Sequence, residues 1–201
     1  MTELEKRGGD LGVEVRADDG GKKTLKGYAA VFNRDTTIGD YFIEKIAPGA
    51  FDKALHDDVR ALVNHDPGRV IGRTKSGTLR LDVDTRGLKV EIDVPDTMDG
   101  RDLWTLVERG DVSGMSFGFR VTKQEWDETG DLPVRTIHEV ELFEVSAVAF
   151  PAYDDTSLAV RSLEAARTER ANHNLLAAQR RIAERRAAME QKIRGIRQDT
   201  P

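Results

Sequence analysis

The chain has 201 residues, of which 38% are hydrophobic and 33% are charged, and its formal net charge at pH 7 is −5. This length suits one domain with a hydrophobic core plus an appendage, and it is short for two full domains. The absence of cysteine excludes disulfides, thiol catalysis and thiolate metal sites. Four scattered histidines, and the lack of a phosphate loop, nucleotide fingerprint or zinc motif, predict a protein with neither a cofactor nor a metal.

The charge is unevenly distributed along the chain. Residues 161–201 hold ten Arg or Lys and five Asp or Glu, a net charge of +5. Residues 1–160 hold 21 Arg or Lys and 31 Asp or Glu, a net charge of −10. An acidic body without a basic face of interleaved aromatic residues argues against nucleic-acid binding. No window approaches the roughly 18 consecutive apolar residues of a membrane span, and the polar first residues do not resemble a signal peptide. We therefore expect a cytoplasmic protein with neither nucleic acid nor membrane as a partner.

The first part of the chain is dominated by strand patterns. Residues 1 to about 10 are polar and contain glycine, which predicts a flexible lead-in. Alternating or β-branched segments predict strands at 11–16, 25–32, 41–46 and 59–64. The first two of these form a predicted hairpin, and a short amphipathic helix is expected after Pro48, through His56.

The middle of the chain continues this pattern, with further strands expected at 79–83, 88–94 and 115–121. Between the last two, the i, i+3, i+4 spacing of Leu103, Leu106 and Val107 predicts a helix over 99–109 that ends at Gly110. A second hairpin leads from Val121 into a return strand over 136–150. Because closure would hide the edges of so many short strands, we expect an α+β, mainly β fold: a closed or nearly closed antiparallel β-barrel with packed helices.

From Leu158 onward the pattern becomes helical. Apolar residues recur every seven positions at Leu175, Ile182, Met189 and Ile196, but only this one seam is well filled. This predicts a C-terminal helical tail that is a marginal coiled coil or a partner-dependent helix. We therefore divide the chain into a lead-in with the first strand (1–24), a central domain (25–160) and a basic helical tail (161–201).

Two residues stand out as candidates for chemistry. In the strand predicted around 115–121, alternation directs Phe117 and Phe119 to the core and Ser116 to the opposite face. A serine held beside glycines on a rigid strand could be a nucleophile, although Ser and Gly are also common at strand starts and bulges. His65 follows a predicted strand and could be either a catalytic base or a turn cap. A hydroxyl nucleophile needs such a base, and the base needs an orienting acceptor.

The orienting acceptor is expected on the strand predicted at 136–150. If Phe143 and Val145 face the core, Glu144 points to the opposite face, as Ser116 does on its own strand. A half-buried strand with a solvated acid would look the same in sequence. The other candidates on this strand are Glu139, Glu141 and His138, of which the two glutamates would need a bulge to reach that face.

Five sequence blocks occur in order between residues 25 and 160. They are GYAAVF (27–32), IAPGAF (46–51), LVNHD (62–66) with VIG (70–72), GMSFGF (114–119), and LFEVS (142–146) with FPAY (150–153). Together they closely resemble the prohead (capsid maturation) serine proteases of tailed bacteriophages, a family related in fold to the herpesvirus assemblins. The resemblance implies Ser116 as nucleophile and His65 as general base and then general acid. It implies an acid on the last strand as orienter; Glu144 matches the family block best, and Glu141 is its close competitor.

The resemblance also implies a function and partners. By this resemblance the chain is expected to be a serine endopeptidase. Such an enzyme cleaves scaffold segments, often the N-terminal delta domain of the major capsid protein, and then itself. The partners would be that capsid or scaffold segment and a second copy of the chain, inside the assembling procapsid in the host cytoplasm. The basic tail could target the enzyme to capsid or scaffold subunits, or be removed by self-cleavage. A non-catalytic assembly protein with the same barrel, and a barrel hydrolase of small esters, are the alternatives.

Overall fold

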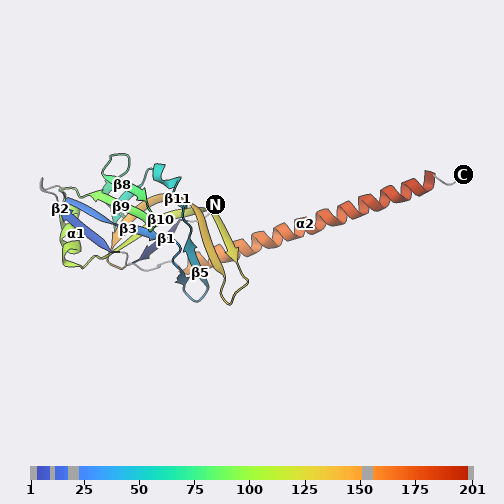
Figure 1. The fold of residues 1–201 in the computed structure, drawn as a ribbon, viewed down its shortest axis with the longest axis horizontal. Coiled ribbons are helices and arrows are strands. Elements are labelled where there is room, and N and C mark those ends of the chain that lie inside the picture. The colour runs from blue at the N-terminus through green and yellow to red at the C-terminus, as the bar shows by residue number, and fades with distance from the viewer. Residues whose placement is uncertain (1–3, 10–11, 18–22, 151–155, 199–201) are drawn as a thin grey trace. The chain divides into compact units, whose positions relative to one another are not determined.

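A computed structural model describes residues 4–9, 12–17, 23–150 and 156–198, so residues 151–153 of the last sequence block lie outside the described part. The chain forms two compact units, Met1–Ala159 and Val160–Pro201. Figure 1 shows its elements in chain order: β1 (Glu5–Gly9), β2 (Val13–Ala17), β3 (Lys23–Val31), β4 (Thr36–Ile38), β5 (Phe42–Ile46), the 3₁₀ turn η1 (Ala54–His56), β6 (Arg60–Val63), β7 (Asp66–Arg73), β8 (Leu79–Val83), β9 (Gly87–Asp93), α1 (Met98–Arg109), β10 (Gly114–Asp127), β11 (Val134–Val148) and α2 (Thr156–Gln198).

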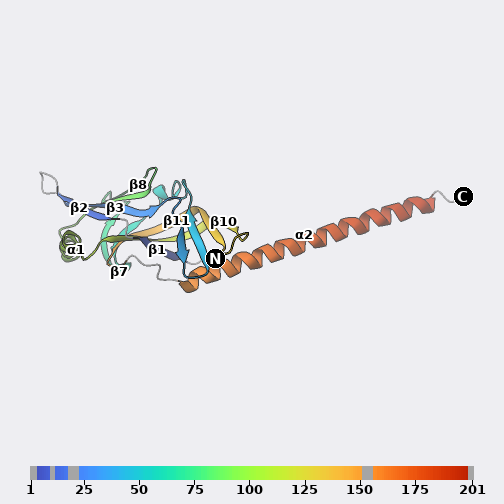
Figure 2. The same ribbon diagram turned by 60° about the horizontal axis from the view of Figure 1, so that its bottom comes forward.

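The strands of the first unit form two sheets. In the larger sheet the described strands follow the order β1-β10-β11-β5-β4, and β6 pairs with both β11 and β7. The smaller sheet is antiparallel throughout, in the order β2-β3-β9-β8. Figures 1 and 2 both show α1 beside β2, with which it is in contact. The fold is therefore α+β and mainly β, as predicted.

The predicted closed or nearly closed antiparallel barrel is wrong. Within the described ranges no backbone ladder joins the two sheets, so neither closes on itself or on the other. The larger sheet is also not antiparallel throughout, because the first half of β11 pairs parallel with β5 and the second half pairs parallel with β6. Between these halves the loop before η1 reaches the strand, where the Val140 N–H donates to the Ala50 carbonyl at 3.2 Å. This loop therefore lies between the two strands that pair with this side of β11.

One hydrophobic cluster takes side chains from both sheets. Phe117 of β10 lies at its centre, in a T-shaped contact with Phe51 (5.5 Å between ring centroids) and stacked on Phe119 (4.6 Å). The predicted alternation of β10 is confirmed, because Met115, Phe117 and Phe119 are all buried in this cluster. Ser116 therefore lies on the face of β10 that points away from the cluster.

Several locally patterned elements are confirmed. The β2–β3 and β10–β11 hairpins form, and the helix predicted over 99–109 is α1. The Thr97 side chain accepts from the Gly100 N–H at its start, and Gly110 ends it in the left-handed region at φ 82°. The helix predicted through His56 is only the short turn η1.

The expectation of a flexible lead-in over residues 1 to about 10 is wrong for residues 5–9. These residues form β1, which pairs antiparallel with β10. Their sequence, EKRGG, has no apolar alternation, and ion pairs hold the strand instead. Arg135 binds both carboxylate oxygens of Glu5 at 2.7 and 2.8 Å, and Arg7 binds Glu44 at 2.7 Å. All four side chains are at most 4% exposed.

The second unit is built on α2, which confirms the predicted helical tail. Most of its described side chains beyond Glu164 are exposed, and Arg180 pairs with Glu184 one turn later at 3.0 Å. Along the described parts of the chain no helix is both long and apolar enough to cross a membrane. The predicted role of α2 in a coiled coil or in targeting stays a prediction.

The approach of β9 to β3 gives a test of this fold. A Cβ at Gly87 would stand 2.0 Å from the Ala30 carbonyl oxygen, whereas one at Gly130 would meet its nearest neighbour, the Leu132 oxygen, at 3.7 Å. We expect Gly87→Ala to lower the free energy of unfolding by about 1–3 kcal/mol, because the β3 backbone must move. Gly130→Ala should lower it by much less. Equal urea midpoints for the two variants would contradict the β3–β9 packing.

Candidate active site

His65 is placed by a tight turn between β6 and β7. Asn64 and His65 both adopt left-handed backbone conformations, with φ of 49° and 60°, which residues other than glycine seldom adopt. The turn is tied to β11 by Asn64, whose N–H donates to the Ala147 carbonyl at 3.0 Å and whose side-chain oxygen accepts from the Ala149 N–H at 3.1 Å. The strained turn is therefore held by the strand that carries Glu144.

The His65 imidazole is bound directly by the Glu144 carboxylate. Nδ1 of His65 lies 2.5 Å from Oε1 of Glu144, and the two side chains are 14% and 10% exposed. The Ser146 hydroxyl donates to the other oxygen, Oε2, at 2.7 Å, and it accepts from the His65 backbone N–H at 3.2 Å. An ionised carboxylate here accepts the Nδ1 proton, which leaves Nε2 of His65 free to accept another proton.

Ser116 lies one strand away from this pair. On β10 it is the direct partner of Ser146 on β11 and of Gly8 on β1. It is 3% exposed, and its hydroxyl donates to the Arg7 carbonyl oxygen at 2.8 Å. The described residues show no hydrogen bond between Ser116 and His65. The structure thus brings the predicted serine, histidine and acid to one region of the larger sheet, with the hydroxyl turned toward β1.

Gly118 makes room for the carboxylate. It is the partner of Glu144 in the β10–β11 ladder, and a Cβ there would lie 2.5 Å from Oε1 of Glu144. The ladder bulges immediately after this pair. Any larger residue at 118 would push the carboxylate away from His65.

The other candidates on β11 have partners elsewhere. Glu141 forms an exposed ion pair with Arg120 at 2.7 Å, and Glu139 pairs with Lys53 at 2.6 Å. His138 lies 3.4 Å from Glu125. None of the three is joined to His65 by a hydrogen bond or ion pair within the described residues. The carboxylate beside His65 is that of Glu144.

The predicted phase of β11 was partly wrong. Phe143, expected in the core, is partly exposed and packs under the Arg120 guanidinium at 5.0 Å, while Leu142 is buried instead. The bulges of the β10–β11 ladder shift the phase, and they leave no trace in hydropathy. Glu144 and Ser146 still share one face. Ser146, to which sequence analysis gave no role, could have been found from its position two residues after Glu144.

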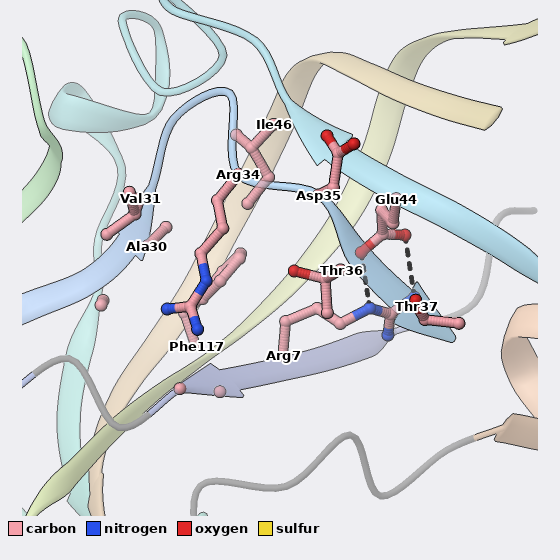
Figure 3. Close-up of a pocket in the computed structure, with 13 residues that line it drawn as sticks. Arg7, Ala30, Val31, Arg34, Asp35, Thr36, Thr37, Glu44, Ile46 and Phe117 are labelled. Atoms are coloured by element: carbon pink, nitrogen blue, oxygen red, sulfur yellow. Dashed lines mark hydrogen bonds and ion pairs between the residues drawn. The ribbon is translucent and has the colours of Figure 1, made fainter. Parts of the chain in front are cut away.

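A cavity of about 280 Å³ lies against β1, beside the core face of β10. Its lining includes Arg7, Glu44 and Phe117. In Figure 3 the Arg34 side chain extends toward Phe117, and dashed lines join Arg7 to Glu44. The cavity is therefore bordered by β1 and by the ion pairs that hold it. Over the described residues, no group of three or more His, Asp or Glu side chains could hold a metal ion.

A strand-borne serine near a histidine that a buried carboxylate fixes is the arrangement typical of serine hydrolases. Comparison with known proteins narrows this class. Residues 12–171 match the family model described as caudovirus prohead serine protease. The chain is 32% identical over 167 residues to the prohead protease of Enterobacteria phage HK97, covering 79% of this chain and 69% of that protein. This chain belongs to the caudovirus prohead serine protease family, whose members act in capsid maturation.

Two further relatives agree with this assignment. The prohead protease of Escherichia phage T5 is 32% identical over 96 residues, which cover 48% of this chain and 42% of that protein. The solved structure of the bacteriophage T4 capsid assembly protease superposes with a TM-score of 0.51 at 13% identity, over 73% of this chain and 97% of that one. The second likeness shows that the fold is shared.

The buried hydroxyl of Ser146 predicts a stability effect. Ser146→Ala leaves the His65 N–H and one oxygen of Glu144 without their partner, so we expect a loss of about 1–3 kcal/mol in the free energy of unfolding. Thr122 offers a matched control, because its hydroxyl donates to the Glu139 carboxylate at 3.0 Å from an exposed position on the same pair of strands. Thr122→Ala should cost well under half as much by urea denaturation. Equal losses would mean that the Ser146 bonds are not buried.

Proposed function

We propose that this chain is a serine endopeptidase of procapsid maturation, with Ser116 as nucleophile, His65 as general base and then general acid, and Glu144 as the orienting carboxylate. The observation that carries the proposal is the 2.5 Å contact between His65 Nδ1 and Glu144, which lies one strand from Ser116. Family membership supplies the reaction class. Among the acids on β11, the geometry favours Glu144 over Glu141 for the third role.

The proposed mechanism gives each of the three residues one task. Once the Ser116 hydroxyl leaves the Arg7 carbonyl and turns toward His65, Nε2 takes its proton while Oγ attacks a peptide carbonyl carbon. The Glu144 carboxylate stabilises the imidazolium that forms. The tetrahedral intermediate collapses to an acyl-enzyme as His65 protonates the leaving amine, and a water activated by the same imidazole then hydrolyses the ester.

The substrate is proposed from the relatives. Two of them are named prohead proteases and the third a capsid assembly protease. We therefore assign to this chain a scaffold or delta segment of the major capsid protein as substrate, within the procapsid in the host cytoplasm. A second proposed substrate is another copy of the chain, with removal of the basic tail, residues 161–201.

Co-expression with the phage's major capsid protein tests this function. We expect the wild-type chain to remove an N-terminal fragment of the capsid protein, and Ser116→Ala and His65→Ala to leave it intact, because each variant lacks a reacting group. The measurement is the intact mass of both proteins, which also reports any loss of the tail. Ser76→Ala removes an exposed hydroxyl and is the control. Equal cleavage by Ser116→Ala and wild type would favour a non-catalytic assembly protein.

The third role has its own test on the same strand. Glu144→Gln keeps the shape but removes the charge that holds the imidazolium, so we expect the cleavage rate to fall by about 10²- to 10⁴-fold. Glu141→Gln breaks only an exposed ion pair with Arg120 and should leave the rate nearly unchanged. Rates are compared under single-turnover conditions. A larger loss for Glu141→Gln would transfer the role to that residue.

A further inference from the structure

β1 is an edge strand that pairs directly beside the proposed nucleophile. It ends the order of the larger sheet and pairs with β10 over five residue pairs, from Glu5 with Phe119 to Gly9 with Met115. Gly8 is the partner of Ser116, and a Cβ at Gly8 would lie 3.1 Å from the Ser116 Cβ. Only a very small residue fits against the serine in this register.

The contact between β1 and Ser116 is unproductive. The hydroxyl proton is engaged by the Arg7 carbonyl oxygen at 2.8 Å, so it is not available to His65. The serine is 3% exposed. A peptide that pairs with β10 as a strand on this edge can bind only when β1 leaves it, because β1 already occupies these positions.

The side chains of β1 are recognised by two buried residues of the body. Two nitrogens of Arg135 donate to the Glu5 carboxylate at 2.7 and 2.8 Å. Two nitrogens of Arg7 donate to the Glu44 carboxylate at 2.7 and 3.1 Å. Such two-pronged contacts between charged groups are strong and depend on geometry. Arg135 and Glu44 thus select a strand that has an acidic residue and, two positions later, a basic residue.

The charges allow β1 to leave. Glu5 and Arg7 depart together as a neutral pair, and they leave Arg135 and Glu44 joined to each other at 2.9 Å. The removal of one partner alone would leave a buried charge unpaired, which is strongly destabilising. Burial by itself raises the pKa of Glu5, but Arg135 and Arg7 outweigh it and hold that pKa below its usual range. Arg135 and Glu44 therefore each keep a partner of opposite charge whether β1 is bound or has left.

We propose that β1 is a tethered inhibitory strand that fills the substrate groove along β10. The peptide segment that replaces it pairs with β10 as an added strand and has the same form: an acidic residue, any residue, a basic residue and then a small residue. The catalytic consequence rests on the proposed function, whereas the groove and its selectivity are properties of the folded chain.

The chain itself supplies a matched pair of variants. Glu5→Ala/Arg7→Ala removes both anchors of β1 and keeps the Arg135–Glu44 pair. Glu14→Ala/Arg16→Ala removes another Glu-x-Arg pair, which is exposed on β2 at 3.2 Å. The probe is a fluorescent peptide of residues 4–9, LEKRGG, with LAKAGG as its control. Binding is measured by anisotropy, which needs no catalysis.

We expect LEKRGG to bind the Glu5→Ala/Arg7→Ala chain at least about tenfold more tightly than it binds the wild type or the Glu14→Ala/Arg16→Ala chain. LAKAGG should bind none of them comparably. Gly8→Leu expels β1 by its bulk without touching the anchors' partners, and it should also increase peptide binding. Hydrogen exchange should show faster exchange of the β10 amides in both open variants, and slower exchange once LEKRGG is added.

The outcomes separate the two proposals. Equal peptide binding by all chains, or binding of LAKAGG as tight as that of LEKRGG, overturns the inhibitory strand even if the enzyme cleaves capsid protein. Selective peptide binding without cleavage by any chain supports the groove and contradicts the proposed protease. If both hold, Glu5→Ala/Arg7→Ala cleaves the capsid protein faster than wild type, and LEKRGG inhibits it.

Discussion

The hydrogen bond between His65 and Glu144 depends on more of the fold than any other contact in the site. It needs the parallel pairing of β6 with β11, which brings the turn after β6 to the level of Glu144. It needs the left-handed backbone at His65 and the missing side chain at Gly118. Ser146 then fixes both partners, through the His65 N–H and the second oxygen of Glu144. The left-handed backbone is a local cost in strain, which a structure bears where it positions a functional group.

A second group of interactions, the buried ion pairs of Glu5, Arg7, Glu44 and Arg135, fixes the position of β1. Desolvation offsets much of the attraction in a buried ion pair, but the removal of one partner alone is strongly destabilising, so such pairs depend on the right partner. Arg135 and Glu44 therefore suit selection of a strand better than support of a core. The same residues explain why a charged and glycine-rich segment is ordered beside Ser116. The Arg7 carbonyl oxygen links this strand directly to the proposed nucleophile, because it accepts the hydrogen bond of the Ser116 hydroxyl.

How much the sequence could predict depended on the range of the interactions involved. The helix α1 and the two antiparallel hairpins follow from local spacing, caps and turns, and they were predicted correctly. The faces of Ser116 and Glu144 also followed from alternation. The closed antiparallel barrel was wrong because β11 pairs parallel with β5 and β6, and because no ladder joins the two sheets within the described residues. Local hydropathy does not encode the order of distant strands. β1 was missed because partners 37 and 130 residues away bury its charges.

The central claim is that Ser116 is made nucleophilic by His65, and covalent labelling tests it most directly. The purified wild-type chain and the Glu5→Ala/Arg7→Ala chain, in which β1 has lost its anchors, are treated with an organofluorophosphonate, which forms a stable phosphonyl ester with an activated serine. The modified residue is identified by tandem mass spectrometry. The account predicts an adduct on Ser116, formed at least about 100-fold more slowly in His65→Ala. An adduct on another serine, or labelling of Ser116 at the same rate without His65, would contradict it.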